Sequence, residues 1–354
     1  MSEYANKKTR GAFIAAVLSI QGLGILVGSL VTVVVCKVFD AATRHRNPSP
    51  KLEADLAWRI ILMIGAIPAA MTFYWRMLMP ETPRYTASVE RNVQQAPMNV
   101  QPVRLLNLNQ IVEDYTDSTP NPSPPSPSYP LFSQELLLRH GRDLFSCAAS
   151  WLLIDVVFNS SDLFQCNFLP SEPKLNAFQD AYRVARFQAL FAVSSTIPGY
   201  LATFIFIDRI GRIKIQIMGF SFMAICFFSA GIPYDKYWQH DRHRVGFLFL
   251  YGLTFFFLNF GPNTTMFIVP AELFPAKFWS TCHGISGAFG KVGAIIGSVW
   301  ILWATQDGNQ GTHEASTLII LGGVCVLGML VTYLFVRETT GRSLEENENV
   351  RMGM

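Results

Sequence analysis

The sequence predicts an all-α membrane protein with about eight transmembrane helices. Half of the 354 residues are hydrophobic and only 15% are charged, whereas a soluble domain carries roughly 25% charged residues. The apolar residues are gathered in long uncharged runs, among them residues 60–74, 218–234 and 245–271. Each run approaches or exceeds the ~20 residues that a helix needs to cross a ~30 Å hydrocarbon layer. Several runs of this kind exclude the single buried core helix of a soluble protein.

The apolar runs divide into eight candidate spans. The third is the weakest by hydropathy, because Asp155, Asn159 and Asp162 interrupt it. The spans lie at about residues 11–36, 56–79, 144–165, 186–207, 213–233, 246–269, 281–304 and 316–336.

Lysine and arginine residues between the spans indicate the orientation in the membrane. The connections that would share one side are richer in these residues, notably 7–10, 209–214 and the segment after residue 336. Cytoplasmic loops carry an excess of basic residues. We therefore expect both termini and the long connection, about residues 80–143, to lie on the cytoplasmic side.

The long connection 80–143 divides the chain unevenly. Its stretch PNPSPPSPSYP cannot propagate a helix or a sheet, which predicts a linker; a docking site for a proline-binding module is the alternative. PETPR after the second span and RETTGR after the eighth look like equivalent ends of two six-span halves. We expect two spans of an N-terminal half in 1–79, a C-terminal six-helix half in 144–340 and a cytoplasmic tail in 341–354. Four further spans would then precede Met1.

Composition also argues against several other classes of protein. The net charge of +3 is too small to suggest nucleic-acid binding, and the six cysteines show no CxxC spacing. The sequence offers no metal-ligand cluster, no nucleotide-binding glycine loop and no nucleophile with its base. We expect no cofactor, no metal and no enzymatic activity.

A short charged turn, IDRIGRIK at residues 207–214, joins two spans. Gly211 permits a sharp reversal, and Asp208 can pair with Arg212 or cap a neighbouring helix end. Together with Arg209, these residues resemble the D-R-x-G-R loop of the major facilitator superfamily, which latches helices and gates the cytoplasmic side. The motif marks the superfamily and says nothing about substrate.

The third span carries candidate substrate-binding groups. Trp151, Asp155 and Asn159 are four residues apart, so they share one helix face. An unpaired carboxylate is costly inside a membrane, so Asp155 should face a cavity, a partner or a substrate path. The alternative is an interfacial helix with solvated acids.

Seven segments spread along the chain match one family: MSEYANKKTRGAFIAAVLSIQGLGILVG, PETPRYT, WLLIDVVF, FIDRIGRIKIQ, FFFLNFGPNTTMFIVPAELFPA, GKVGAIIGS and RETTGRSLEE. Through them the chain resembles the plant-type high-affinity phosphate:proton symporters of the major facilitator superfamily. The resemblance implies twelve helices in two halves, with phosphate held near the midplane. It further implies a plasma-membrane protein whose partners are inorganic phosphate, protons and the lipid bilayer, and it leaves a homo-oligomer open.

The resemblance also implies a phosphate site. Its contacts map onto Gln21, Trp151, Asp155 and one asparagine of the NFGPN segment, either Asn259 or Asn263. Amide and indole N–H groups can donate to phosphate oxygens. Asp155 can hydrogen-bond a phosphate oxygen only when one of the two carries a proton, because two anions this close repel. Proton and phosphate movement would thereby be coupled.

Two positions in the spans add to this site. The family has a tyrosine where this chain has Asn159, whose shorter amide would change affinity or selectivity. Lys291 lies deep in the seventh span among small residues that permit close helix packing. It would neutralise phosphate or Asp155; the alternative is that it snorkels to the cytoplasmic surface.

The predicted function is phosphate:proton symport by alternating access. Because that mechanism needs two opposing halves, we expect this chain alone not to accumulate phosphate. We also expect the DNA upstream of the Met1 codon to encode further spans. A sugar-porter-like transporter is one alternative, disfavoured because a sugar needs neutral polar groups rather than Asp155. A non-transporting phosphate-binding or regulatory protein is another, and phosphate binding without uptake would distinguish it.

Overall fold

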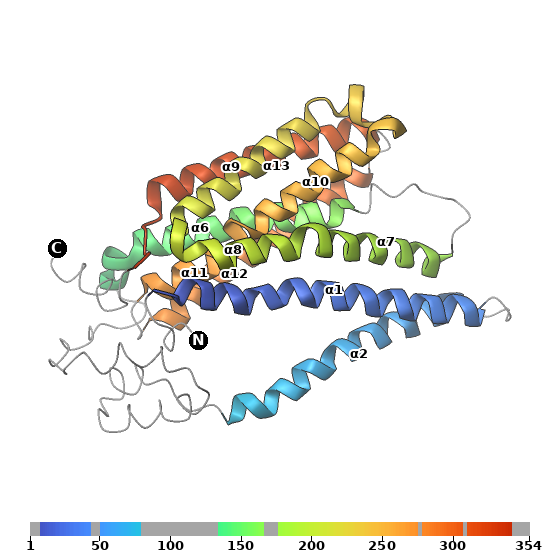
Figure 1. Ribbon diagram of the computed structural model, residues 1–354, viewed down its shortest axis with the longest axis horizontal. Coiled ribbons are helices and arrows are strands. Elements are labelled where there is room, and N and C mark those ends of the chain that lie inside the picture. The colour runs from blue at the N-terminus through green and yellow to red at the C-terminus, as the bar shows by residue number, and fades with distance from the viewer. Residues whose placement is uncertain are drawn as a thin grey trace.

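The described part of the chain forms a bundle of long helices. The computed structural model describes residues 8–43, 50–78, 134–165, 176–274, 278–306 and 310–341. Eight helical stretches within these residues are long and apolar enough to cross a membrane, and the long helices lie roughly side by side (Figure 1). The predicted all-α membrane fold with eight spans is confirmed.

Each predicted span corresponds to one helical stretch. Two spans are interrupted: α7 joins α8 through a π-helical turn at Ala192–Thr196, and α10 is followed after a break by α11. Helix α6 begins ahead of the predicted residue 144. The helices are α1 (Arg10–Thr43), α2 (Pro50–Met77), α6 (Gln134–Phe164), α7 (Ala177–Phe191), α8 (Ile197–Ile210), α9 (Arg212–Gly231), α10 (Arg244–Asn259), α11 (Pro262–Leu273), α12 (Trp279–Gln306) and α13 (Gln310–Phe335).

The break between α10 and α11 has a local cause. Pro262 lacks a backbone N–H and its ring excludes the carbonyl of the preceding turn, so a helix cannot run through it unchanged. It occupies the first position of α11, where no donor is needed. Gly261 precedes it and lies so close to Gly219 of α9 that a Cβ on Gly219 would be 2.7 Å from the Gly261 Cα. The break brings the asparagines on either side, Asn259 and Asn263, to the bundle interior, where both are buried.

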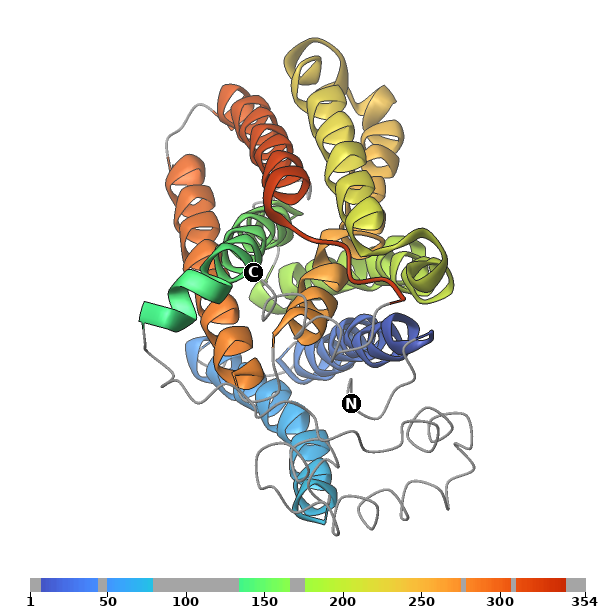
Figure 2. The ribbon, with the colours of Figure 1, turned by 90° about the vertical axis from the view of Figure 1, so that its left-hand side faces the viewer.

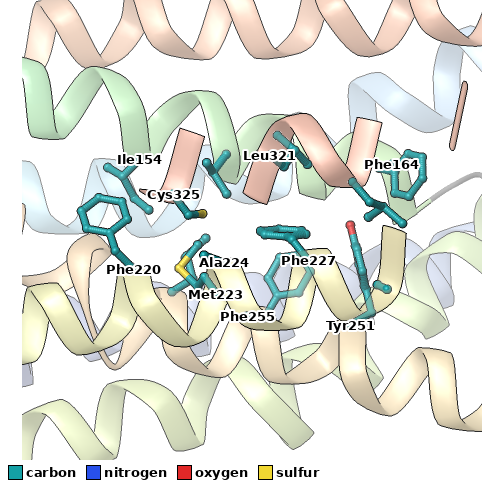
Figure 3. Packing of buried hydrophobic residues seen from close by; sticks show 14 of the residues in the cluster. Ile154, Phe164, Phe220, Met223, Ala224, Phe227, Tyr251, Phe255, Leu321 and Cys325 are labelled. Carbon is teal, nitrogen blue, oxygen red and sulfur yellow. The ribbon is translucent and has the colours of Figure 1, made fainter. Parts of the chain in front are cut away.

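An aromatic core holds α6, α9, α10 and α13 together. Ile154, Phe220, Phe227, Tyr251 and Leu321 each have at most 1% of their surface exposed, and they face one another between the helices (Figure 3). Close packing matters here because lipid tails are as apolar as the side chains, so dispersion contacts rather than water exclusion bind the helices.

Helix α2 lies at the edge of this bundle. It leans away from the other helices along most of its length (Figure 1) and meets α1 near Val35 and Ala57. Its large apolar side chains, such as Met63 and Trp75, are exposed. These side chains suit contact with lipid.

Glycines allow α12 to lie against α6. A Cβ on Gly293 would collide with the Leu152 carbonyl oxygen, and one on Gly297 would lie 2.6 Å from the Val156 carbonyl oxygen. The predicted close packing around Lys291 is confirmed.

Replacing Gly293 by alanine should destabilise this helix pair, because the added methyl group must push α12 away from α6. Overpacking of this kind costs about 1–3 kcal/mol. Thermal unfolding in detergent would measure the loss. Gly323→Ala on α13 is the matched control, because nothing lies within 4 Å of a Cβ there. Equal unfolding temperatures for the two variants would contradict this packing.

Candidate functional site

Trp151 and Asp155 are buried on the face of α6 that packs against α12. Their exposed fractions are 5% and 6%. Gly290 makes room for both side chains, since a Cβ there would lie 2.8 Å from Trp151 Nε1 and 2.9 Å from Asp155 Oδ2. The predicted shared face is therefore present, and it depends on a glycine of the neighbouring helix.

Lys291 pairs with Asp155 across this interface. Its Nζ atom lies 3.8 Å from Asp155 Oδ2. The carboxylate side chain is 8% exposed and the lysine side chain is 80% exposed. The lysine thus neutralises a buried carboxylate while its ammonium remains accessible to an entering anion.

Asn159 lies one turn further along α6. Its Nδ2 donates to the Asp155 backbone carbonyl at 2.9 Å. One N–H donor of the Asn159 amide is therefore used within its own helix.

A second group of polar side chains joins four other helices. Tyr200 of α8 donates its hydroxyl proton to Gln21 Oε1 of α1 at 3.1 Å. Asn263 Nδ2 of α11 donates to the Tyr200 hydroxyl oxygen at 2.9 Å and to Asn259 Oδ1 of α10 at 2.8 Å. We call these four residues the amide group. Tyr200 was not predicted from the sequence, where its only signal was a hydroxyl within an apolar run.

The group formed by Trp151, Asp155 and Lys291 adjoins the amide group through α11. Phe267 follows Asn263 by four residues, so both lie on one face of the helix, about 6 Å apart along its axis. The Phe267 ring meets the Trp151 ring edge to face, with centroids 4.7 Å apart. The predicted residues from α1, α6, α10, α11 and α12 therefore form two neighbouring polar groups.

The short turn between α8 and α9 forms the centre of a charged network, which we call the latch. Gly211 has φ +102°, a conformation that favours glycine. Asp208 accepts the backbone N–H groups of Gly11 at 3.1 Å and Ala12 at 2.8 Å, and it pairs with Arg212 at 2.9 Å. It thus fulfils both predicted roles, since it caps the start of α1 and pairs with Arg212. Arg209 is exposed.

Arg212 is 1% exposed and holds α11. Its Nε donates to Glu272 Oε2 at 3.0 Å and its Nη2 to Glu272 Oε1 at 2.7 Å. This two-pronged geometry is the strongest form of an arginine–carboxylate pair. Glu272 was not anticipated, although it is an acid between apolar residues.

The segment after α13 closes the latch. Arg337 approaches Asp143 of α6 at 3.8 Å, and Glu338 accepts the backbone N–H of Arg212 at 3.0 Å. The Thr339 hydroxyl donates to Glu272, and Thr340 accepts from Arg212 at 3.2 Å. Figure 2 looks onto this end of the bundle, where the red segment crosses from α13 towards the start of α9. Four successive residues therefore contact α6, α9 and α11.

Replacing Glu272 by glutamine should strongly destabilise the latch, because Arg212 stays buried with fewer compensating charges. Breaking a buried ion pair costs about 3–5 kcal/mol. Thermal unfolding measures the loss. The control is Asp55→Asn on α2, whose pair with Arg59 at 3.0 Å is exposed and should contribute about 0–1 kcal/mol. Similar losses in both variants would refute the role of Glu272.

Glu338 gives the latch a dependence on pH. Burial raises the pKa of this carboxyl, but hydrogen bonds from Thr340 and from the backbone of Arg212 and Ile213 outweigh it and leave the pKa below its ordinary 4.5. A carboxyl with a lowered folded-state pKa stabilises the fold above its unfolded pKa, and this contribution is lost as pH falls through the folded value.

Acidification should therefore destabilise the wild-type chain more than the Glu338→Gln variant, which has no carboxyl to titrate. Unfolding temperatures over a pH series that extends below 4.5 would measure the difference. Parallel curves for the two proteins would contradict it.

Comparisons with known proteins identify the family of the chain. Residues 1–350 match the family model described as sugar (and other) transporter. "Probable inorganic phosphate transporter 1-9" of Arabidopsis thaliana is 55% identical, covering 99% of this chain and 69% of the relative. "Low affinity inorganic phosphate transporter 1" of Petunia hybrida is 46% identical, covering 98% of this chain and 67% of the relative. The chain thus spans about two thirds of these relatives' length.

Among solved structures, the proton:xylose symporter XylE of E. coli has a similar fold. The form bound to 6-bromo-6-deoxy-D-glucose gives a TM-score of 0.70 at 20% identity, covering 99% of this chain and 69% of that chain. This similarity concerns the fold alone. The family resemblance of the sequence is confirmed, and the chain belongs to the inorganic phosphate transporters of the sugar (and other) transporter family, within the major facilitator superfamily.

Proposed function

We propose that this chain takes part in the transport of inorganic phosphate across the plasma membrane together with protons. One observation carries the proposal: a buried carboxylate inside the spans, Asp155, is paired with an accessible cation, Lys291. Relatives with 46% to 55% identity are named inorganic phosphate transporters. An ionisable pair at membrane depth is expensive and is usually kept for a substrate or ion path.

The pair suits coupled binding of an anion and a proton. An arriving phosphate would attract the Lys291 ammonium and weaken its hold on Asp155. Two neighbouring anions repel, so binding is favourable only when Asp155 or the phosphate carries a proton. Trp151 and the amide group would form neutral hydrogen bonds with the remaining P–O and P–OH groups of the phosphate.

The latch suits the gating of this site. It ties the start of α1 to α8 through Asp208, and to α9 and α11 through Arg212. In the proposal, α1 and α2 belong to an N-terminal half in residues 1–79, and 144–340 form the C-terminal half. Both termini and the linker 80–143 would be cytoplasmic. Opening towards that side would break the Asp208 bonds to α1, as alternating access requires.

Replacing Asp155 by asparagine should abolish the coupling, because the amide cannot take up and release the proton. Loss of a charged hydrogen-bonding group costs about 1.5–3 kcal/mol, or about 10–100-fold in phosphate affinity. Radiolabelled phosphate uptake with and without a pH gradient measures both effects. The chain and an upstream-extended version would be compared, with Asp55→Asn as the control.

The outcomes separate the candidate functions. Gradient-driven uptake that Asp155→Asn removes supports the proposal. Uptake that is unchanged in the Asp155→Asn variant, or transport of a sugar instead, would refute the proposal. Phosphate binding without uptake, even in the extended version, would favour a regulatory phosphate-binding protein.

A further inference from the structure

The Tyr200 hydroxyl lies between two candidate phosphate ligands. The side chain is 1% exposed, and its ring packs against α1, where a Cβ on Gly22 would be 3.2 Å from Tyr200 Cδ2. The hydroxyl oxygen is 3.1 Å from Gln21 Oε1 and 2.9 Å from Asn263 Nδ2. The Tyr200 hydroxyl therefore bridges the side-chain amides of Gln21 and Asn263, which come from different helices.

These bonds determine which atom Asn263 can offer to a ligand. A side-chain amide has two N–H donors and one carbonyl acceptor. Both donors of Asn263 are used, one by Tyr200 and one by Asn259 Oδ1 at 2.8 Å. Asn259 is itself oriented, because its Nδ2 donates to the Phe255 carbonyl at 2.7 Å. Asn263 therefore has only its acceptor oxygen left for a ligand.

Gln21 is oriented in the opposite sense. Because Asn263 donates to the Tyr200 oxygen, the single hydroxyl proton is directed to Gln21 Oε1. The Gln21 amide keeps both N–H donors for a ligand, and its side chain is exposed. Successive hydrogen bonds polarise one another, so the donation from Asn263 strengthens Tyr200 as a donor, and Tyr200 in turn strengthens Gln21.

We propose that Tyr200 is a positioning residue that fixes Gln21 as a donor and Asn263 as an acceptor, so that the site selects a protonated oxyanion. This inference rests on the proposed function. Dihydrogen phosphate has ionised oxygens for the Gln21 donors and a P–OH group for the Asn263 acceptor. Sulfate has the same shape but no O–H group at the same pH, so the acceptor oxygen would repel it. Specificity then comes from the Asn263 acceptor oxygen, which disfavours the binding of sulfate.

The test is Tyr200→Phe, which keeps the ring and removes the hydroxyl. The full chain in lipid nanodiscs would be probed with radiolabelled phosphate at mildly acidic pH, with sulfate as competitor. Phosphate affinity should fall about tenfold, as for the loss of one buried hydrogen bond with its orienting effect. Sulfate should compete better than in the wild type, because the freed Asn263 amide can turn and donate.

Two further variants distinguish a positioning role of Tyr200 from a general loss of stability. Tyr251→Phe also removes a buried hydroxyl, one that donates to the Ser161 carbonyl at 2.6 Å, and it should leave the phosphate-to-sulfate preference unchanged. In a Gln21→Ala background, Tyr200→Phe should cost less phosphate affinity than in the wild type, since part of its effect passes through Gln21.

The possible results differ for the two proposals. A wild-type chain that binds no phosphate would overturn the proposed function and this inference together. Phosphate binding with an unchanged sulfate preference in Tyr200→Phe, or with fully additive losses in the double variant, would overturn the inference alone.

Discussion

The cost of burying charge in a membrane explains the arrangement of the described bundle. Arg212 is 1% exposed and Glu272 2%, and neither charge would be tolerated without the other. Their pairing fixes α9 against α11. Arg212 also pairs with Asp208 and donates a hydrogen bond to Thr340. Helix positions at one end of the bundle thus follow from the need to surround one guanidinium with acceptors.

The same constraint acts at the site. Asp155 is buried, and its charge is met by Lys291, which remains largely exposed. The latch pair Arg212–Glu272 is enclosed on both sides, whereas the Asp155–Lys291 pair is open on one side. The first suits a structural lock and the second suits exchange with a mobile ion.

Helix α11 connects the site to the latch. Asn263 at its start belongs to the amide group, Phe267 contacts Trp151, and Glu272 at its end holds Arg212. A single helix of 12 residues therefore contacts both regions. Any shift of α11 on phosphate binding would be felt at Glu272, and through Arg212 and Asp208 at the start of α1.

Much of this fold was predictable, because hydrophobic runs of membrane length and the spacing of Trp151, Asp155 and Asn159 are local properties of the sequence. The Gly211 turn and the Asp208–Arg212 pair were local as well, whereas the α1 amides that Asp208 caps are far away in the sequence. Tyr200, Glu272 and Glu338 were missed because their importance comes from partners far away in the sequence: Tyr200 bonds Gln21, Glu272 pairs with Arg212, and Glu338 caps α9. Nor could spacing distinguish Asn259 from Asn263, since the hydrogen-bond directions emerge only when four helices meet.

The most direct test of the link between site and latch is hydrogen–deuterium exchange of the Gly11 and Ala12 amides, which Asp208 caps. These amides should exchange at a different rate when phosphate is bound, and sulfate at the same concentration should leave them unchanged. Phosphate binding that leaves the exchange of these two amides unchanged would contradict a link between site and latch.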